Sequence, residues 1–311
     1  MSGIEITTFL KLTFLTMVPF IFSSQGTMLS GRTGVFIVAQ EGIMLAGASI
    51  GFIISYLTGS NIVGVLAAAA VGGVFGLAMA YFTTTLRVNQ FVIGLALFFF
   101  GMGISTLVPK FVIGVTMTPP LITTLKNIPI PFLSDIPFLG EILFNQNIMV
   151  YASILLSILL YYFLYHTQLG LEMRSVGENP KAADSLGINV SAMRYGAIIV
   201  GSMLIGVAGF YLPLVYTGTF TELMTRGRGW LSGALAFFGG WRPHTIFYGA
   251  LFFAAIEVLA YKVQIASIGI PYQFLLMLPY VSTLIIMMLT FKRSTTPAFL
   301  GKNYDREDRS L

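Results

Sequence analysis

Long apolar runs separated by short polar segments dominate the hydropathy pattern of this chain. A helix needs about 20 apolar residues to cross the hydrocarbon core of a bilayer. The runs that reach or approach this length are 6–22, 40–58, 62–84, 90–108, 148–166, 195–215, 245–262 and 273–291. A further run, 229–240, is too short alone and is either extended by Phe220–Arg228 or part of a broken helix. The pattern predicts an all-α bundle of about nine membrane spans, roughly eight to ten, formed by one domain over residues 1–311.

The composition independently favours a membrane class. Of the 311 residues, 56% are hydrophobic and 9% are charged, whereas an ordinary soluble domain carries about a quarter charged residues. So few polar groups cannot cover the surface of a soluble fold. The sequence has no Cys and two His, which excludes disulfides and argues against a structural zinc site. We therefore expect neither a metal site nor a cofactor bound by this chain.

The distribution of Lys and Arg sets the expected orientation. With nine crossings and the charged tail 292–311 in the cytoplasm, most basic residues fall on the cytoplasmic side. The net charge of +5 is then explained by the membrane, and no nucleic-acid partner is expected. The same scheme places the N-terminus and the Pro-rich segment 109–147 outside. Alternating prolines forbid a continuous helix there, so we expect a folded extracellular cap.

One central segment, 172–194, gathers charge and turn residues in an otherwise apolar chain. Asn179 is suited to cap a helix, Pro180 to its first position and Gly187 to its end. The intervening helix of about two turns is too short to be stable unless it docks on something. An ordinary cytoplasmic loop is the alternative. The residues expected to form the docking helix and its flanks are Gly177, Glu178, Asn179, Pro180, Lys181, Ala182, Ala183, Asp184 and Gly187.

Four stretches of the chain resemble one protein family, in the order in which the family has them. KAADSLG (181–187) has the spacing of the EAAxxxG cytoplasmic motif of ATP-binding-cassette (ABC) importer permeases, with Lys181 replacing the acidic residue. Three others resemble patterns of the branch that imports simple sugars and nucleosides. They are GRTGVFIVAQEGIMLAGASIGF (31–52), LRVNQFVIGLAL (86–97) and TRGRGWLSGALAFFGGWRP (225–243). Phe36, Ala39 and Gly240 depart from residues that are frequent in those patterns.

The resemblance implies a multi-pass permease subunit of a bacterial cell membrane, with no enzymatic activity of its own. It implies a separate ABC ATPase subunit that binds ATP and on which the short helix docks, because this chain has no GxxxxGK[ST] phosphate loop. A second permease subunit, expected to be a different chain, an extracellular substrate-binding lipoprotein and membrane lipid complete the implied partners. Nucleosides are favoured as substrate over simple sugars, and an ion-coupled secondary transporter is the remaining alternative.

Polar side chains within the spans are candidates for the translocation pathway. Glu257 lies in the middle of the run 245–262. An acid in hydrocarbon usually faces a cavity or a partner, so Glu257 either hydrogen-bonds substrate hydroxyls or pairs within the bundle. Gln40 and Glu41 begin a span after a segment that is expected to break the helix. Broken helices often flank transport sites, although simple capping of the helix is the alternative.

Two further pairs of residues are assigned roles at the ends of spans. Asn89 and Gln90 follow Arg87 at a cytoplasmic end, where we expect either an inner gate or interfacial capping. Arg226 and Arg228 fall in an expected outer loop. There they are candidates for contact with acidic groups of a binding protein, with a solvated loop as the alternative.

Overall fold

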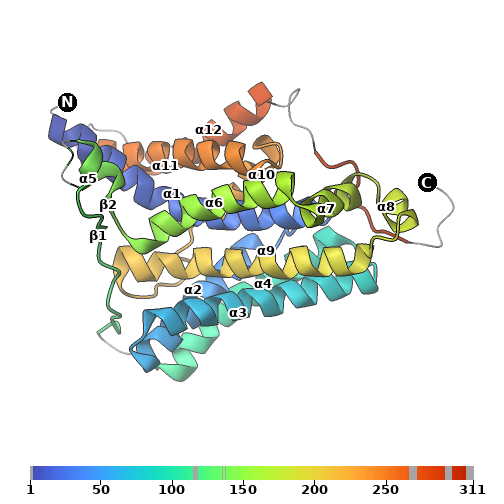
Figure 1. The fold of residues 1–311 in the computed structure, drawn as a ribbon. Helices are drawn as coiled ribbons and strands as arrows, with labels where there is room; N and C mark the ends of the chain where they lie inside the picture. Colours follow the sequence, from blue (N-terminus) through green and yellow to red (C-terminus); the bar gives the residue numbers. More distant parts are fainter. Residues whose placement is uncertain are drawn as a thin grey trace.

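The computed structural model describes residues 3–114, 118–134, 136, 138–265, 272–290 and 296–305. Figure 1 shows a bundle of helices with one small two-stranded ladder at one end. The long helices are α1 (Gly3–Gly31), α2 (Gln40–Thr58), α3 (Asn61–Ala80), α4 (Gln90–Val112), α6 (Ile148–His166), α9 (Val190–Tyr211), α11 (Pro243–Ile265) and α12 (Tyr272–Thr290). The shorter ones are α5 (Leu139–Leu143), α7 (Gln168–Glu178), α8 (Pro180–Ser185) and α10 (Arg228–Phe238), with π-helical turns η1 (Tyr81–Thr85) and η2 (Leu212–Thr217).

The two ends of the bundle differ in what covers them. One end, called here the cap end, carries α5 and the strands β1 (Ile128–Pro129) and β2 (Asn145–Gln146) (Figure 1). The opposite end, called here the coupling end, carries α7 and α8. The start of α1 lies at the cap end, whereas the tail segment 296–305 lies at the coupling end. The sequence-based prediction that the N-terminus and the tail fall on opposite sides agrees with this arrangement.

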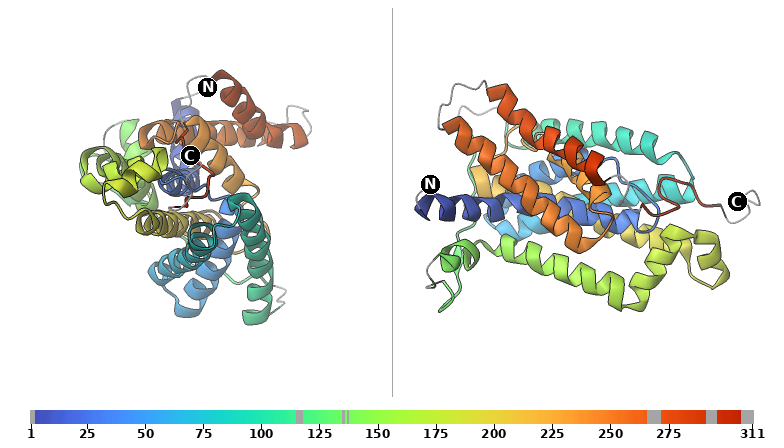
Figure 2. Two further views of the ribbon diagram at one scale, coloured as in Figure 1. Left: turned by 90° about the vertical axis from the view of Figure 1, so that its right-hand side faces the viewer. Right: turned by 90° about the horizontal axis from the view of Figure 1, so that it is seen from above.

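Seven helices within the described residues are long and apolar enough to cross a membrane. They are Ile6–Gly31, Gln40–Thr58, Asn61–Thr85, Gln90–Val112, Ile148–His166, Val190–Thr217 and Pro243–Gln264. Helix α12 has a shorter apolar stretch, Gln273–Ile286, and lies at the periphery beside α11 (Figure 2). The predicted count of about nine spans is therefore not confirmed, while the all-α, multi-pass architecture is.

The short apolar run 229–240 forms a helix that crosses only half of the hydrocarbon core. Helix α10 has 11 residues and is about 16 Å long, roughly half the thickness of the hydrocarbon core. At the cap end Ile122 N donates to Gly218 O at 2.8 Å, and at the coupling end Arg32 Nε donates to Trp241 O at 2.7 Å. The segment 218–241 thus runs the length of the bundle, first as irregular chain and then as α10. The broken-helix alternative describes it correctly.

Helix α1 extends nine residues beyond the apolar run 6–22, through a polar stretch that hydropathy alone does not read as membrane. The polar side chains there are fully buried, and some of them bond within the fold: Thr27 Oγ1 donates to Ser23 O at 3.0 Å. Gln25 Nε2 donates to Pro243 O at 3.0 Å. The helix ends at Gly31, and an irregular segment, 32–39, leads to α2.

Helix α9 lies at the centre of the bundle, packed against α1, α2 and α3. Small residues make this contact possible, because backbones touch where a side chain would not fit. A Cβ on Gly206 would lie 2.3 Å from Ala68 O, and one on Gly47 would lie 2.3 Å from Gly206 O. Close backbone approach through small residues is the usual way in which helices pack in lipid.

The Pro-rich segment folds over the cap end through short elements. Asn61 Nδ2 donates to Thr123 O at 2.7 Å, and Lys11 pairs with Glu141 at 3.5 Å. These contacts tie the segment to the starts of α1 and α3. The expectation of a folded cap concerns 109–147; within it, α4 continues to Val112, and residues 115–117, 135 and 137 lie outside the described residues. Its extracellular location stays a prediction.

Candidate functional site

The short charged segment forms the capped helix that its sequence predicts. Asn179 Oδ1 accepts from Ala182 N at 3.0 Å, Pro180 is the first residue of α8, and Gly187 has φ +86° just beyond its end. Glycine takes this left-handed conformation without the strain that a Cβ would add. With six residues, α8 is somewhat shorter than the two turns expected.

One face of α8 packs on this chain and the other is exposed. Ala183 is buried against Val176 of α7 and Val190 of α9. Ala183 is expected to belong to the docking helix, and its side chain is used to seat α8 on the bundle of this chain. Leu186 is 82% exposed, and Ala182 is exposed beside it. An apolar side chain this exposed at the end of a docked helix marks the outward face of the coupling segment 172–194.

The tail segment 296–305 crosses the coupling end and ties α7 and α8 to the rest of the bundle. Phe299 N donates to Gly177 O at 2.9 Å, and Gly301 N donates to Gly34 O at 3.0 Å. Tyr304 OH donates to Asp184 Oδ2 at 3.1 Å. The sequence predicted only a charged cytoplasmic tail, and nothing in its composition identifies these backbone contacts. Residues 306–311 and 291–295, which belong to the predicted tail segment or border it, lie outside the described residues.

Further contacts of the tail segment involve charged side chains. Glu178 Oε2 accepts from Ala298 N at 3.2 Å, so the carboxylate at the end of α7 is held by the tail. Arg87, between η1 and α4, forms an ion pair with Asp305 and accepts at its carbonyl from Asn303. The tail segment therefore bridges the coupling segment, the irregular segment 32–39 and the corner before α4.

Asn89 and Gln90 have different roles at that corner. Asn89 Oδ1 accepts from Phe91 N at 2.9 Å and from Val92 N at 3.3 Å, which is the capping interaction expected as the alternative to a gate. Gln90 is buried, accepts from Phe36 N at 3.0 Å and donates to Lys302 O at 3.3 Å. Gln90 thus fixes the irregular segment 32–39 to the tail segment. An inner-gate role for either residue stays a prediction.

Arg32 is the first residue of the irregular segment 32–39 and lies just beyond the candidate span Ile6–Gly31. Its side chain also holds this segment in place. Its guanidinium donates through Nε to Trp241 O at 2.7 Å and through Nη2 to Tyr165 OH at 3.3 Å. Burial lowers the pKa of Arg32 from its ordinary value. The base of α2 is thereby attached to the end of α10.

Glu41 binds the start of α10 with its carboxylate. The group accepts from Thr225 Oγ1 at 2.6 Å, from Gly227 N at 2.8 Å and from Gly229 N at 2.7 Å. The free N–H groups at the start of a helix and the positive end of its dipole both favour a carboxylate there. Glu41 is 6% exposed, and its carboxylate caps α10 across the chain, so the starts of two interrupted helices meet inside the bundle.

Gln40, beside Glu41 at the start of α2, is fully buried. Neither its amide oxygen nor its amide nitrogen has a hydrogen-bond partner among the residues that the structure describes. The amide lies against α10, because a Cβ on Gly233 would be 2.9 Å from Gln40 Nε2. The structure thus brings Gln40 and Glu41 to α10, and pathway roles for both stay predictions.

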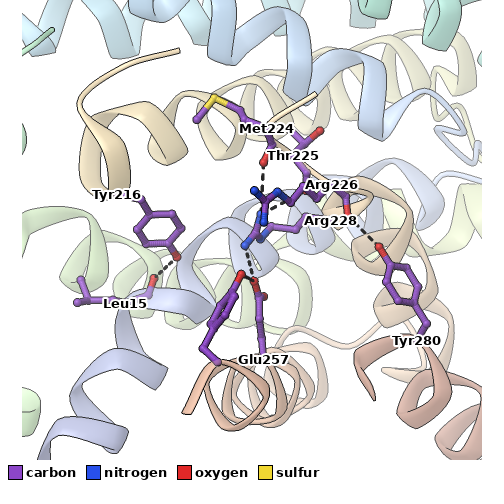
Figure 3. Close-up of polar contacts among 9 residues, drawn as sticks. Leu15, Tyr216, Met224, Thr225, Arg226, Arg228, Glu257 and Tyr280 are labelled. Carbon is purple, nitrogen blue, oxygen red and sulfur yellow. Dashed lines mark hydrogen bonds and ion pairs between the residues drawn. The ribbon is translucent and has the colours of Figure 1, made fainter. Parts of the chain in front are cut away.

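Glu257 of α11 pairs with Arg228, the first residue of α10 (Figure 3). The side chains are 10% and 12% exposed, and Tyr261 OH also donates to Glu257 Oε1, at 3.0 Å. Arg228 Nη1 lies 3.4 Å from both Met224 O and Thr225 O. The sequence placed Arg228 in an exposed outer loop, and this placement is wrong, because the side chain turns inward to Glu257. Glu257 has the bundle partner that was one of its two expected environments.

Arg226 has the exposure that Arg228 lacks. The backbone carbonyl of Arg226 accepts from Tyr280 OH of α12 at 2.8 Å (Figure 3). Arg226 as a whole residue is exposed. Contact with a binding protein is therefore open to Arg226 and stays a prediction. Among the described residues no group of three or more His, Asp or Glu side chains is placed to hold a metal ion.

The described residues thus form a bundle of membrane-spanning helices with an interrupted crossing and a capped helix seated at one end. The chain belongs to the family described as the permease component of the branched-chain amino acid transport system, which matches residues 8–291. It is accordingly an ABC transporter permease of the nucleoside and sugar type and a multi-pass protein of the cell membrane, not an enzyme.

Curated relatives cover most of the chain. A nucleoside ABC transporter permease, NupC of Lactococcus lactis, is 34% identical over 92% of this chain and 93% of its own length. A guanosine ABC transporter permease, NupQ of Bacillus subtilis, is 30% identical over 96% of both chains. A putative glucose ABC transporter permease, TsgC13 of Haloferax volcanii, is 32% identical over 79% of this chain and 74% of its own. No solved structure shows a significant match to the chain.

Proposed function

We propose that this chain is the membrane-spanning subunit of an ATP-driven importer of nucleosides. The observation that carries the proposal is α8, a short helix capped by Asn179 and seated through Ala183, with Leu186 exposed at its outer side. An isolated helix of six residues is not stable in water, so its retention at the end of the bundle is explained by a docking function. The family assignment supplies the class of partner for such a helix.

The ATPase that docks on α8 is a separate subunit, because the sequence has no phosphate-binding loop of its own. ATP-driven closure of that subunit moves α8 and, with it, the tail segment and the irregular segment 32–39. A second permease chain completes the membrane unit, and an extracellular binding protein delivers the solute at the cap end. Lipid surrounds the remaining apolar surface.

The substrate class is argued from two observations. The charged side chains that meet inside the bundle, Arg228 and Glu257, neutralise one another, which suits an uncharged polar solute better than an ion. NupC and NupQ, named for nucleosides and guanosine, align over more than nine tenths of the chain, whereas the putative glucose permease and a further nucleoside permease each align over 79% of it. Glu257 is our candidate for contact with hydroxyl groups of the solute.

Uptake into sealed vesicles tests the proposal. The chain is co-reconstituted with a candidate ATPase, second permease and binding protein from the same organism, and uptake of radiolabelled guanosine, uridine and glucose is measured. We expect nucleoside uptake that requires ATP, stops with vanadate and ignores proton or sodium ionophores. Uptake that follows an ion gradient and continues with vanadate would contradict the proposal, and preferential uptake of glucose would contradict the substrate class.

A further inference from the structure

The start of α10 carries a charge that local helix physics disfavours. Arg228 is the first residue of α10, so its cation sits at the positive end of the helix dipole, where an anion is favoured instead. The N–H groups of this helix start already have an acceptor, since Glu41 binds Gly227 N and Gly229 N. Capping of α10 therefore explains Glu41 and leaves the Arg228–Glu257 pair without a local structural purpose.

A buried ion pair is also a costly way to join two helices. The desolvation of two charges frequently exceeds their attraction, and an apolar contact of similar volume is often at least as stable. In hydrocarbon the cost is greater, and such groups commonly mark a substrate or ion pathway. Residues whose local preferences conflict with the surrounding fold are expected mainly at functional positions.

Arg228 has hydrogen-bonding capacity beyond its pairing with Glu257. A guanidinium has five N–H donors and no acceptor. Its Nε has no partner among the described residues, and its two contacts through Nη1 are long, at 3.4 Å. The residue is 8% exposed, so bulk water does not replace the missing partners. Buried donors of this kind are normally paired, and each exception calls for an explanation.

These side chains line a cavity between α10, α11 and α12. The cavity, called here the Arg228 cavity, has a volume of about 280 Å³ and polar groups from Arg228, Glu257, Tyr261, Gln264 and Tyr280. Arg226 also lines it, and the rest of its wall is apolar. Small-molecule sites typically have this form, a mainly apolar hollow with a few convergent polar groups. The smallest of them have volumes of about 300 Å³, close to that of the Arg228 cavity.

A second hollow lies on the cap-end side of the same residues. It has a volume of about 180 Å³, is lined by Tyr216, Thr217 and Thr221, and shares Arg228 and Tyr261 with the Arg228 cavity. Tyr216 OH donates to Leu15 O at 3.2 Å, which places this hollow along α1 (Figure 3). The two cavities share Arg226, Arg228 and Tyr261 as lining residues, so both lie beside the Arg228–Glu257 pair.

We propose that the Arg228 cavity is a solute-contact site in which the Arg228 guanidinium and the Glu257 carboxylate hydrogen-bond the ribose hydroxyls of a nucleoside, flanked by Tyr261 and Tyr280. The inference rests on the proposed function and adds a site to it. Glu257 accepts from one hydroxyl and the Arg228 guanidinium donates to another, so vicinal hydroxyl groups satisfy both residues at once. The tyrosine rings offer flat apolar surface to the base.

The test compares a neutral pair with the charged pair in the complete importer. In Arg228→Gln with Glu257→Gln, no unpaired charge remains, and uptake of a ribonucleoside and of its 2′-deoxy and 3′-deoxy analogues is measured. Wild type is expected to prefer the ribonucleoside by at least about tenfold, the worth of one hydrogen bond to a charged group. The double variant is expected to lose most of that preference. The exposed pair Lys110–Glu222, changed to Gln in the same way, serves as the control.

Accessibility supplies a second readout that does not depend on transport by a damaged variant. Because the natural chain has no Cys, a single Gln264→Cys variant carries one reactive thiol in the Arg228 cavity. We expect a water-soluble thiol reagent to label it and a saturating ribonucleoside to slow labelling at least tenfold. Leu259→Cys, on an exposed face of the same helix, is the control that the nucleoside leaves unchanged.

The outcomes separate this inference from the proposed function. If wild type imports no nucleoside, the proposed function fails. If wild type imports nucleosides but the double variant keeps the same preference among analogues, the Arg228 cavity is not the contact site. Equal labelling of Gln264→Cys with and without nucleoside also overturns the inference, whether or not the double variant assembles.

Discussion

Removal of the Glu41 carboxylate is expected to destabilise the junction between α2 and α10 strongly. Glu41→Ala leaves Gly227 N and Gly229 N buried without their acceptor and removes the partner of Thr225 Oγ1. A buried donor left unpaired costs about 1–3 kcal/mol, so the two amides together predict a loss of about 2–6 kcal/mol. Glu41→Gln keeps one acceptor oxygen, and we expect about half of that loss.

Thermal unfolding in detergent measures the effect, with Glu141→Ala as the control. At roughly 2 °C per kcal/mol for a chain of this size, Glu41→Ala lowers Tm by about 4–12 °C. Glu141 pairs with Lys11 but is 59% exposed, and an exposed pair contributes less than about 1 kcal/mol. Hydrogen exchange localises the change, because the amides at the start of α10 lose protection. A Glu41→Ala protein with unchanged Tm and protected amides at Gly227 and Gly229 would refute this reasoning.

Three further predictions concern packing and the coupling end. Gly206→Ala places a Cβ about 2.3 Å from Ala68 O, so overpacking is expected to cost about 1–3 kcal/mol; Gly196→Ala, with open space, is expected to leave Tm unchanged or raise it. Asn179→Ala removes the α8 cap, at about 1 kcal/mol, and is expected to reduce nucleoside uptake per ATP hydrolysed, whereas Asn179→Ser keeps both. Phe299→Ala removes a buried ring from the tail segment, and limited proteolysis is expected to cut within 296–305 faster than in wild type.

The sequence predicts best where one local rule decides the structure. Long apolar runs identify the helices, because length and hydropathy alone determine whether a segment crosses a bilayer. The two ends of α8 follow from residues close to it in sequence: Asn179 and Pro180 at its start and Gly187 beyond its end all adopt the geometry expected of them. The family is likewise predicted from motifs of consecutive residues, and the match over 8–291 bears this out.

Prediction fails where a residue's role depends on a partner far along the chain. Arg228 is read as a loop residue because nothing near it in sequence shows Glu257, 29 positions away. The end of α1 is missed because Gln25 is polar, although its amide bonds Pro243 O inside the bundle. The tail segment binds through backbone groups such as Phe299 N, which composition does not distinguish from any other backbone. In each case tertiary contacts satisfy groups that look unsuited to their surroundings.

The coupling segment and the Arg228 cavity are joined by rigid contacts, with few flexible steps between them. Gly177 of α7 lies so close to the 32–39 segment that a Cβ would be 2.2 Å from Arg32 O. That segment leads directly into Glu41, which binds the backbone that carries Arg228. Packed backbone contacts transmit a displacement because they cannot compress. In the proposed importer, a shift of α8 would therefore move the start of α10 through the start of α2. The proposed docking helix and the proposed solute-contact site would then lie at opposite ends of one chain of packed contacts.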